Sequence, residues 1–346
     1  GGVVQRLKVM ARMDLTQTRR PQDGKFRFTH HGETYDVRMS TLPTVAGENV
    51  VLRILPRNAS IAGFEALGMS AEHIEQMERL IASPHGIVLV TGPTGSGKTT
   101  TLYTALSRLN TPDRNIMTIE DPVEIRLPLV RQTQVNTEIG MTFAGALRSI
   151  LRQDPDVVLV GEIRDSETAQ IAVQASLTGH LVFSTLHTND ALGAVARLVD
   201  LGVPRFAVNG ALLGALAQRL VRRVCEHCRI EDAPDEATMR FWGLEPHEAG
   251  GFSRGRGCGA CLDTGYRGRV GVYELLIMTP GLRDAIDAGA TPQQLQRAAI
   301  ESGLKPMWQD GLEKARLGLT SLEELTRLRA AIDESTHVYE DRRVAA

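Results

Sequence analysis

One stretch decides the fold of this 346-residue chain: Gly86-Ile87-Val88-Leu89-Val90-Thr91-Gly92-Pro93-Thr94-Gly95-Ser96-Gly97-Lys98-Thr99. Residues 86–90 are apolar, too short for a typical helix and bounded by Pro84 and Gly92, which predicts a buried strand. Residues 92–99 match the pattern G-x-x-x-x-G-K-[ST] at every defined position. A helix is expected directly afterwards, over residues 100–110. A strand, a glycine-rich turn and a helix in this order predict a loop that binds phosphate.

Each residue type in this loop suits a bound nucleotide. Backbone N–H groups of the turn can point at the β- and γ-phosphates, and the helix N-terminus adds a favourable dipole. Lys98 supplies a mobile positive charge, and Thr99 offers a hydroxyl to Mg²⁺. A glycine turn that binds nothing is disfavoured because pattern and context agree. The residues expected to bind ATP are Gly92, Pro93, Thr94, Gly95, Ser96, Gly97, Lys98, Thr99 and Thr100.

The composition is that of an ordinary globular protein, with 42% hydrophobic residues. A formal net charge of −2 leaves no excess positive charge for phosphate backbones, so nucleic acid is not an expected partner. No stretch approaches the roughly 20 apolar residues that span a bilayer, and residues 1–8 lack the apolar core of a signal peptide. We expect a soluble cytoplasmic chain. Because it begins with Gly-Gly, we interpret it as a portion of a longer protein.

The domain organisation follows from the apolar runs. Runs at 116–119, 157–160 and 181–185 alternate with helical segments, which implies parallel β-α units and an α/β nucleotide-binding domain. Runs at 35–39 and 49–55 are typical of two strands joined by a loop. We therefore predict an N-terminal α+β domain over 1–58, a linker over 59–69 and the nucleotide-binding domain over 70–346.

Local signals refine these boundaries. Pro21-Gln22-Asp23-Gly24 carries a turn signature. Ser70 is expected to cap a helix that runs to about Ile81. Thr291-Pro292-Gln293-Gln294 and Thr320-Ser321-Leu322-Glu323 both fit a capping box, so helices are expected over 280–335.

Four cysteines form two pairs with two-residue spacing, Cys225 with Cys228 and Cys258 with Cys261. Without an export signal, this arrangement favours a metal site over disulfides. Four thiolates suit tetrahedral Zn²⁺ and leave no open position, so the predicted zinc site is structural. The long interval between the pairs exceeds that of the usual zinc ribbon, and four unliganded thiols are the alternative. The tetracysteine subdomain is expected over residues 220–270.

Carboxylates follow two of the predicted strands. Glu120, Asp121 and Glu124 come after the run 116–119, at the sheet edge where ligands bind, and one could orient water. Glu162 ends the run that begins at Asp156, as in a Walker B motif, although Gly161 stands where many ATPases place an aspartate. We expect Glu162 to contact the metal through water or to position the nucleophile. Solvated acidic loops are the alternative for both.

Histidines and arginines complete the candidates. His180 and His187 flank the run 181–185, and His187 follows the strand end on the nucleotide side, where it can sense the γ-phosphate. The alternative for each histidine is a polar side chain that only makes structural hydrogen bonds. Arginines can stabilise phosphate charge in the transition state, although a salt bridge is the commoner role. The candidate arginines are Arg38, Arg53, Arg148 and Arg152.

Four segments are similar, in order and spacing, to the four boxes of secretion and pilus traffic ATPases: 92–99, 118–124, 156–165 and 179–187. The paired cysteines and the ending Gly265-Tyr266-Arg267-Gly268-Arg269 … Tyr273-Glu274-Leu275-Leu276 resemble the type II secretion system assembly ATPase. The type IV pilus extension ATPase shares both features. Retraction motors are less similar because they generally lack the cysteine module.

The resemblance implies a PAS-like domain over 1–58 and a RecA-like motor domain over 70–346, assembled as a homo-hexamer. It implies ATP hydrolysis that drives pseudopilus assembly for protein secretion, on the cytoplasmic face of the bacterial inner membrane, with inner-membrane platform proteins as partners. A further N-terminal domain that docks on the platform is absent from this sequence, and the tail over 329–346 is longer than expected.

The resemblance also assigns roles to residues. It implies that Glu124 is the water-activating base, Glu162 the Walker B glutamate and His187 the key residue of the histidine box. Arg38 and Arg53 would reach the nucleotide from the N-terminal domain. Arg148 and Arg152 would lie near the subunit interface.

Two other classes remain open at this point. A DNA-translocating RecA-like ATPase would need a basic channel, which the charge balance disfavours. A nucleotide sensor that binds ATP without turnover would use the same loop.

Overall fold

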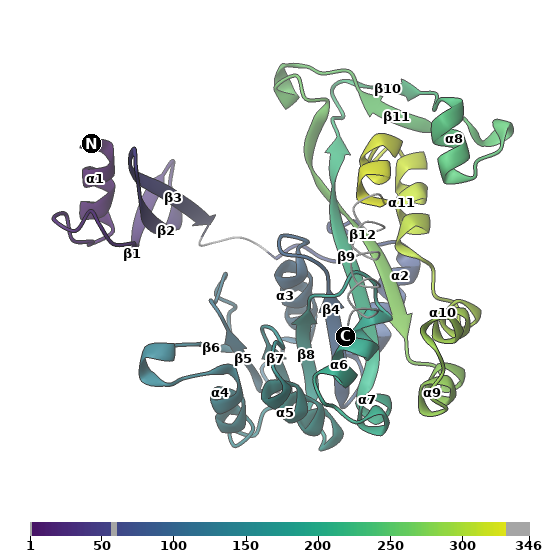
Figure 1. Cartoon of the computed structure of the whole chain (residues 1–346), viewed down its shortest axis with the longest axis horizontal. Coiled ribbons are helices and arrows are strands. Elements are labelled where there is room, and N and C mark those ends of the chain that lie inside the picture. Colours follow the sequence, from purple (N-terminus) through teal and green to yellow (C-terminus); the bar gives the residue numbers. More distant parts are fainter. Residues whose placement is uncertain (1, 57–60, 330–346) are drawn as a thin grey trace. The chain divides into compact units, whose positions relative to one another are not determined.

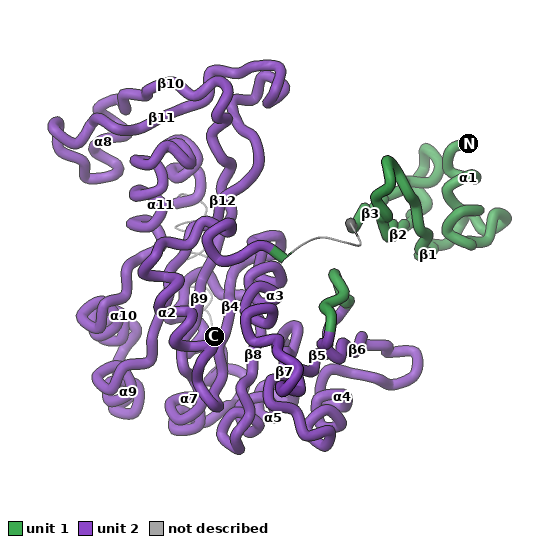
Figure 2. The backbone as a smooth tube through the Cα atoms, turned by 180° about the vertical axis from the view of Figure 1, so that it is seen from behind, with its two compact units in different colours: residues 1–61, 122–128 green, residues 62–121, 129–346 purple. Residues whose placement is uncertain are grey.

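The computed structural model describes residues 2–56 and 61–329, coloured along the chain in Figure 1. The chain forms two compact units, distinguished in Figure 2. One comprises Gly1–Ile61 and Pro122–Pro128, and the other comprises Ala62–Asp121 and Leu129–Ala346. In the described part of the chain, no helix combines the length and apolar character needed to cross a membrane.

The first unit is a helix packed on a three-stranded antiparallel sheet. Its elements are α1 (Gly2–Met10), β1 (Gln22–His30), β2 (Glu33–Thr44) and β3 (Gly47–Pro56). The two strands predicted here are β2 and β3, and a tight turn joins them. Buried Ala11, Met13 and Met39 form a small core with the partly buried Leu7 and Phe26.

The turn predicted at Pro21-Gln22-Asp23-Gly24 is wrong, because residues 22–24 belong to β1. Gly24 is required for close packing instead. A Cβ atom at this position would lie 2.7 Å from the carbonyl oxygen of Ala11. A local turn signature cannot distinguish these two reasons for a glycine.

The second unit is built on a seven-stranded sheet in the order β12-β9-β4-β8-β7-β5-β6. All neighbouring strands are parallel except β12, which is antiparallel to β9. The predicted strands are present as β4, β5, β7 and β8, each with every residue buried, and the α/β fold class is confirmed. The strands are β4 (Gly86–Thr91), β5 (Ile116–Glu120), β6 (Arg131–Gln134), β7 (Val157–Val160), β8 (Leu181–Leu186), β9 (Leu212–Val224) and β12 (Tyr266–Ile277).

Helices flank this sheet. The predicted helix after Ser70 is α2, and the Ser70 side chain accepts a hydrogen bond from the N–H of His73. The helix after the glycine-rich loop is α3. The helices are α2 (Ala71–Ile81), α3 (Lys98–Leu109), α4 (Phe143–Ile150), α5 (Ser166–Leu177), α6 (Gly193–Asp200) and α7 (Arg205–Ala211), with the short η1 (Thr137–Ile139).

The strands β9 and β12 were not detected in the sequence. Leu212–Val224 is rich in leucine, alanine, glutamine and arginine, which are good helix formers. It is a strand because β4 pairs with one edge and β12 with the other, so tertiary pairing overrides local propensity.

The cysteine-containing region and the C-terminal helices complete this unit. The first capping box is confirmed at Thr291, with Pro292 in the first turn. The second is wrong by one residue: Ser321 accepts the N–H of Glu324, because the Thr320 hydroxyl donates to the Arg222 carbonyl. Residues 330–335 of the predicted helical region, and all but the first residue of the tail, lie outside the described residues. The elements are β10 (Arg229–Asp232), α8 (Glu236–Trp242), η2 (Pro246–Glu248), β11 (Phe252–Gly255), η3 (Gly259–Cys261), α9 (Pro280–Asp287), α10 (Pro292–Glu301) and α11 (Met307–Arg316).

A buried polar cluster joins α2, α11 and β12. The Asp310 carboxylate accepts the Tyr273 N–H at 2.8 Å and a bond from the Lys314 ammonium. Nδ1 of His73 lies 3.7 Å from the same carboxylate. All four side chains are buried, so each charge depends on its partner.

Removing Asp310 should leave the Lys314 charge buried without its partner. We expect Asp310→Ala to lower the free energy of unfolding by about 3–5 kcal/mol, measured by thermal or urea unfolding. Adding Lys314→Met should recover part of this loss. Glu323→Ala, which breaks the exposed pair with Arg327, is the control and should cost about 1 kcal/mol or less. A double variant no more stable than Asp310→Ala would contradict this interpretation.

The same cluster should give a pH dependence. Burial lowers the pKa of His73 below its ordinary value of 6.5, against the opposing effect of Asp310. Below pH 6.5 the unfolded chain therefore binds the proton more readily than the folded one, and stability falls as the pH falls. We expect the melting temperature of His73→Leu to decrease less between pH 6.5 and about pH 5 than that of wild type. The same decrease in melting temperature in His73→Leu and in wild type would contradict this expectation. His85→Leu, which replaces an exposed histidine, is the control.

Candidate nucleotide site and cysteine cluster

The glycine-rich loop connects the end of β4 to the start of α3. Gly92, Gly95 and Gly97 have φ values of +146°, +80° and +89°, which side chains with a Cβ atom rarely adopt. At Gly92 space is also lacking, since a Cβ atom would lie 2.5 Å from the carbonyl oxygen of Gln218. The three glycines therefore allow the backbone conformation of this tight loop.

Lys98 crosses the loop. Its ammonium donates to the carbonyl of Gly92 at 2.7 Å and to that of Pro93 at 3.0 Å. Burial lowers the pKa of Lys98 to about 8, while the Glu162 carboxylate opposes this shift and Arg219 adds to it. The structure thus holds a poorly solvated cation at the loop, where an anion would stabilise its charged form.

Two predicted residues lie beside Lys98. Glu162 follows β7, and His187 follows β8. Nε2 of His187 is 3.6 Å from Oε2 of Glu162, which also pairs with Arg164 at 2.7 Å. Burial lowers the pKa of His187, and the Lys98 charge adds to this effect. Lys98, Glu162 and His187 therefore form one electrostatic group at the carboxyl edge of the sheet.

Hydrogen bonds fix the strand ends that carry this group. The Thr91 hydroxyl contacts the Thr188 hydroxyl at 2.7 Å and accepts the Thr188 N–H at 2.8 Å. The loop and the segment after His187 are therefore tied together. His180 precedes β8 at the opposite edge, where Nδ1 contacts the Ala175 carbonyl oxygen at 3.0 Å.

The first unit holds a second group of predicted residues. Arg38 on β2 donates to the Val123 carbonyl at 2.9 Å and lies 4.0 Å from Oε2 of Glu124. Arg53 on β3 is the register partner of Arg38. The segment Pro122–Pro128 thus belongs to this unit by its contacts, with Glu124 beside an arginine of the sheet.

Arg148 on α4 and Arg152 in the turn that follows this helix are exposed and lie apart from these groups. Arg148 pairs with Glu167 on α5 at 2.6 Å. Arg152 donates to the Arg148 carbonyl at 2.9 Å. Within one chain, these arginines are used for surface contacts.

Glu120 differs from the other candidate carboxylates because it is buried. It accepts bonds from the hydroxyl groups of Tyr103 and Thr118 and from Nε2 of Gln132, the last at 3.2 Å. This carboxylate connects the end of β5 with α3 and β6, so it anchors the strand that precedes Pro122.

Two residues on β9, Gln218 and Arg219, lie beside Gly92 of the loop and were not predicted from the sequence. Gln218 donates to the Ser96 carbonyl, and Arg219 donates to Oδ1 of Asn189 at 3.0 Å. Gln218 and Ser96 are 122 positions apart, and β9 itself was not predicted. No local signal could have identified these contacts.

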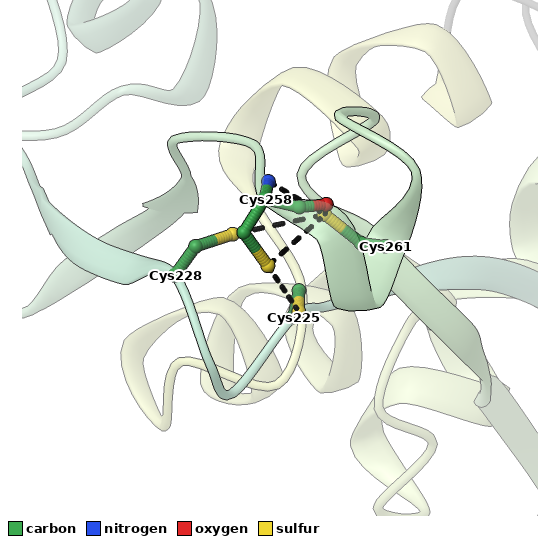
Figure 3. A group of neighbouring side chains, drawn as sticks. All are labelled: Cys225, Cys228, Cys258 and Cys261. Atoms are coloured by element: carbon green, nitrogen blue, oxygen red, sulfur yellow. Dashed lines mark hydrogen bonds between the residues drawn. The ribbon is translucent and has the colours of Figure 1, made fainter.

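The four cysteines converge in space, as Figure 3 shows. Their ligand atoms all lie within 4.8 Å of one another. Three sulfur pairs are 3.7–3.9 Å apart. Tetrahedral ligands at a metal–sulfur distance of about 2.3 Å would lie roughly 3.8 Å apart, so the geometry fits one metal ion.

Backbone N–H groups support the thiolate form at this cluster. Burial opposes ionisation of Cys261, but the N–H groups of Cys258 and Gly265 lower its pKa to about 6. These two donors lie 3.2 and 3.3 Å from its sulfur. Burial raises the pKa of Cys228 to about 11 despite a bond from Gly257. A cation would stabilise all four thiolates together, which fits a metal site.

Sequence comparison places the chain in a family. Residues 1–327 match the family described as "Type II/IV secretion system protein". The chain belongs to this family. The resemblance to secretion and pilus traffic ATPases predicted from the four boxes is therefore confirmed.

Individual relatives agree with this assignment. The chain is 50% identical over 326 residues to "Type II secretion system ATPase E" of Vibrio cholerae, covering 94% of the chain and 65% of that protein. It is 49% identical over 325 residues to "Type IV pilus assembly ATPase PilB" of Thermus thermophilus, covering 93% of the chain and 37% of that protein. The chain thus spans about two thirds or less of the length of these relatives.

A comparison with a solved structure agrees with the family assignment. The crystal structure of the pilus retraction motor PilT with bound ADP superposes with a TM-score of 0.65 and 30% identity. The match covers 94% of the chain and 79% of PilT. The fold is therefore shared with a nucleotide-binding motor of known structure.

The cysteine geometry predicts one tightly bound metal ion per chain. We expect elemental analysis of the purified protein to find about one equivalent, and Cys225→Ser to lower this amount strongly together with the melting temperature. Thr264→Val, beside the cluster but without a ligand atom, is the control for local packing. A full equivalent of metal in Cys225→Ser would contradict the assignment.

Proposed function

We propose that this chain is the catalytic part of a hexameric motor that hydrolyses ATP to drive pseudopilus assembly for type II protein secretion. The observation that carries the proposal is the convergence of Lys98, Glu162 and His187 beside a glycine-rich loop in a chain of this family. The position of this group beside the loop supports a role next to the γ-phosphate of a nucleotide bound there.

The proposed chemistry uses the loop for binding and two carboxylates for hydrolysis. Lys98 and the loop N–H groups hold the phosphates, and Thr99 with Glu162 would hold Mg²⁺, which supplies charge neutralisation when bound. Glu124 orients the attacking water and accepts its proton. His187 senses the γ-phosphate through its proximity to Glu162.

The arginines fit an active site that is completed by assembly. Arg38 and Arg53 share one register position of the small sheet and would supply positive charge to the nucleotide from the N-terminal domain. Arg148 on α4 and Arg152 in the turn after it are exposed, so a neighbouring subunit of a hexamer could engage them. Both pairs are proposed as contributors to charge stabilisation in the closed ring.

We assign the remaining parts by the same proposal. Residues 1–58 form the PAS-like domain, 59–69 the linker and 70–346 the RecA-like domain. The metal at the four cysteines is Zn²⁺ in a structural role, within the subdomain 220–270. The protein acts at the cytoplasmic face of the bacterial inner membrane, with platform proteins as partners and no nucleic acid.

A second candidate function is type IV pilus assembly. The identity of 49% to PilB of Thermus thermophilus favours it almost as strongly as the secretion relative favours export. The chemistry of the site is the same for both functions, so the choice concerns partners only. Complementation of secretion-deficient and pilus-deficient strains by the full gene separates them.

ATP hydrolysis is tested with variants of Lys98, which would bind the phosphates, and of Glu124, which would activate the water. We expect Lys98→Ala to weaken nucleotide binding, and Glu124→Gln to retain binding while phosphate release falls by about 100-fold or more. The full-length protein should be assayed as a hexamer, since the ring completes the site. Glu138→Gln, at an exposed position on η1, is the matched control. A wild-type hexamer that binds ATP without turnover would indicate a nucleotide sensor instead.

A further inference from the structure

We propose that Gln218 is a positioning residue for phosphate binding, which acts through the peptide group between Ser96 and Gly97. The inference rests on the proposed function, because it concerns the same loop. It adds a residue on β9 that lies outside all four sequence boxes.

Both ends of the Gln218 amide are engaged inside the protein. Nε2 donates to the Ser96 carbonyl at 2.6 Å, and Oε1 accepts the Thr101 hydroxyl at 2.8 Å. The side chain is only 1% exposed. Its orientation is determined, because a flipped amide would place two acceptors, Oε1 and the Ser96 oxygen, against each other. Gln218 therefore connects the loop with the first turn of α3.

The bond to Ser96 sets the direction of the next N–H group. In a planar trans peptide the C=O of Ser96 and the N–H of Gly97 point in opposite directions. Holding the carbonyl against Gln218 therefore aims the Gly97 N–H away from β9. Gly97 is the N-cap of α3, where N–H groups have no intrahelical acceptor and favour an anion.

Gln218 also leaves no room for a side chain at Gly92, at the other end of the loop. Its carbonyl oxygen lies 2.5 Å from the place where a Cβ atom of Gly92 would be. Its Nε2 lies 3.1 Å from the corresponding place at Gly97. One residue thus supports the first and last glycines of the loop, by its backbone and by its side chain.

The competing interpretation is that Gln218 only fills space in the core. Methionine has a similar length and volume but neither donates nor accepts in the same way, so it separates the two interpretations. Thr104 provides a matched control for Thr101. It lies one turn later on α3, is equally buried, and its hydroxyl donates to Thr100 at 2.9 Å without contacting Gln218.

The experiment compares four variants of the full-length protein: Gln218→Met, Thr101→Val, Thr101→Ser and Thr104→Val. Dissociation constants are measured with fluorescent ADP and ATP analogues, together with KM, kcat and the melting temperature. We expect Gln218→Met to weaken both nucleotides about tenfold, since both carry a β-phosphate. Thr101→Val should weaken them in the same direction, and Thr101→Ser should restore wild-type affinity. At saturating MgATP, kcat should stay within about threefold of wild type.

The inference would be overturned if the variants Gln218→Met, Thr101→Val and Thr104→Val all bound ADP and ATP with equal affinity, even if their melting temperatures differed. In that case wild-type binding and turnover would leave the proposed function standing. A wild-type protein that binds nucleotide without turnover would instead refute hydrolysis, while the affinity series would still decide the role of Gln218. A wild-type protein that binds no nucleotide would overturn both.

Discussion

The parallel pairing of β4 with β8 and β9 is the constraint on which the candidate site depends. Thr91, the last residue of β4, lies opposite Leu186 on β8 and Ala217 on β9. The residues that follow these positions, namely the glycine-rich loop, His187 and Gln218, are therefore delivered to one edge of the sheet. A shift of β9 by one residue would turn the Gln218 side chain to the other face and remove the support of the loop.

The local parts of this arrangement could be predicted from the sequence. The strand before Gly92 and the helix after it are encoded by a short apolar run and a motif, and the same holds for β7 and β8. Because parallel strands end at the same edge, the order of the elements explains why Glu162 and His187 lie close together, with 3.6 Å between Oε2 and Nε2.

The remainder depends on contacts between distant segments. The β9 sequence favours a helix when read alone, and only its two neighbouring strands make it extended. Gly24 carries a turn signature, but the approach of Ala11 gives it a packing role. The Thr320 hydroxyl fits a capping box, but the Arg222 carbonyl takes its donor and moves the cap to Ser321. In each case a partner that no local window contains decides the outcome.

The cysteine cluster lies at the far end of β9 and β12, the pair of strands whose register also positions Gln218. β9 ends at Val224 immediately before Cys225, and β12 begins at Tyr266 shortly after Cys261. The ladder between these strands is irregular at this end, between Tyr266 and Arg269. The Cys225 N–H bond to the Gly265 carbonyl at 2.9 Å joins the two segments where the ladder is irregular, and a metal ion bound by all four cysteines would add a second connection there. Because Gln218 lies on β9 opposite Tyr273 of β12, the cysteine cluster and the support of the glycine-rich loop depend on the same strand register.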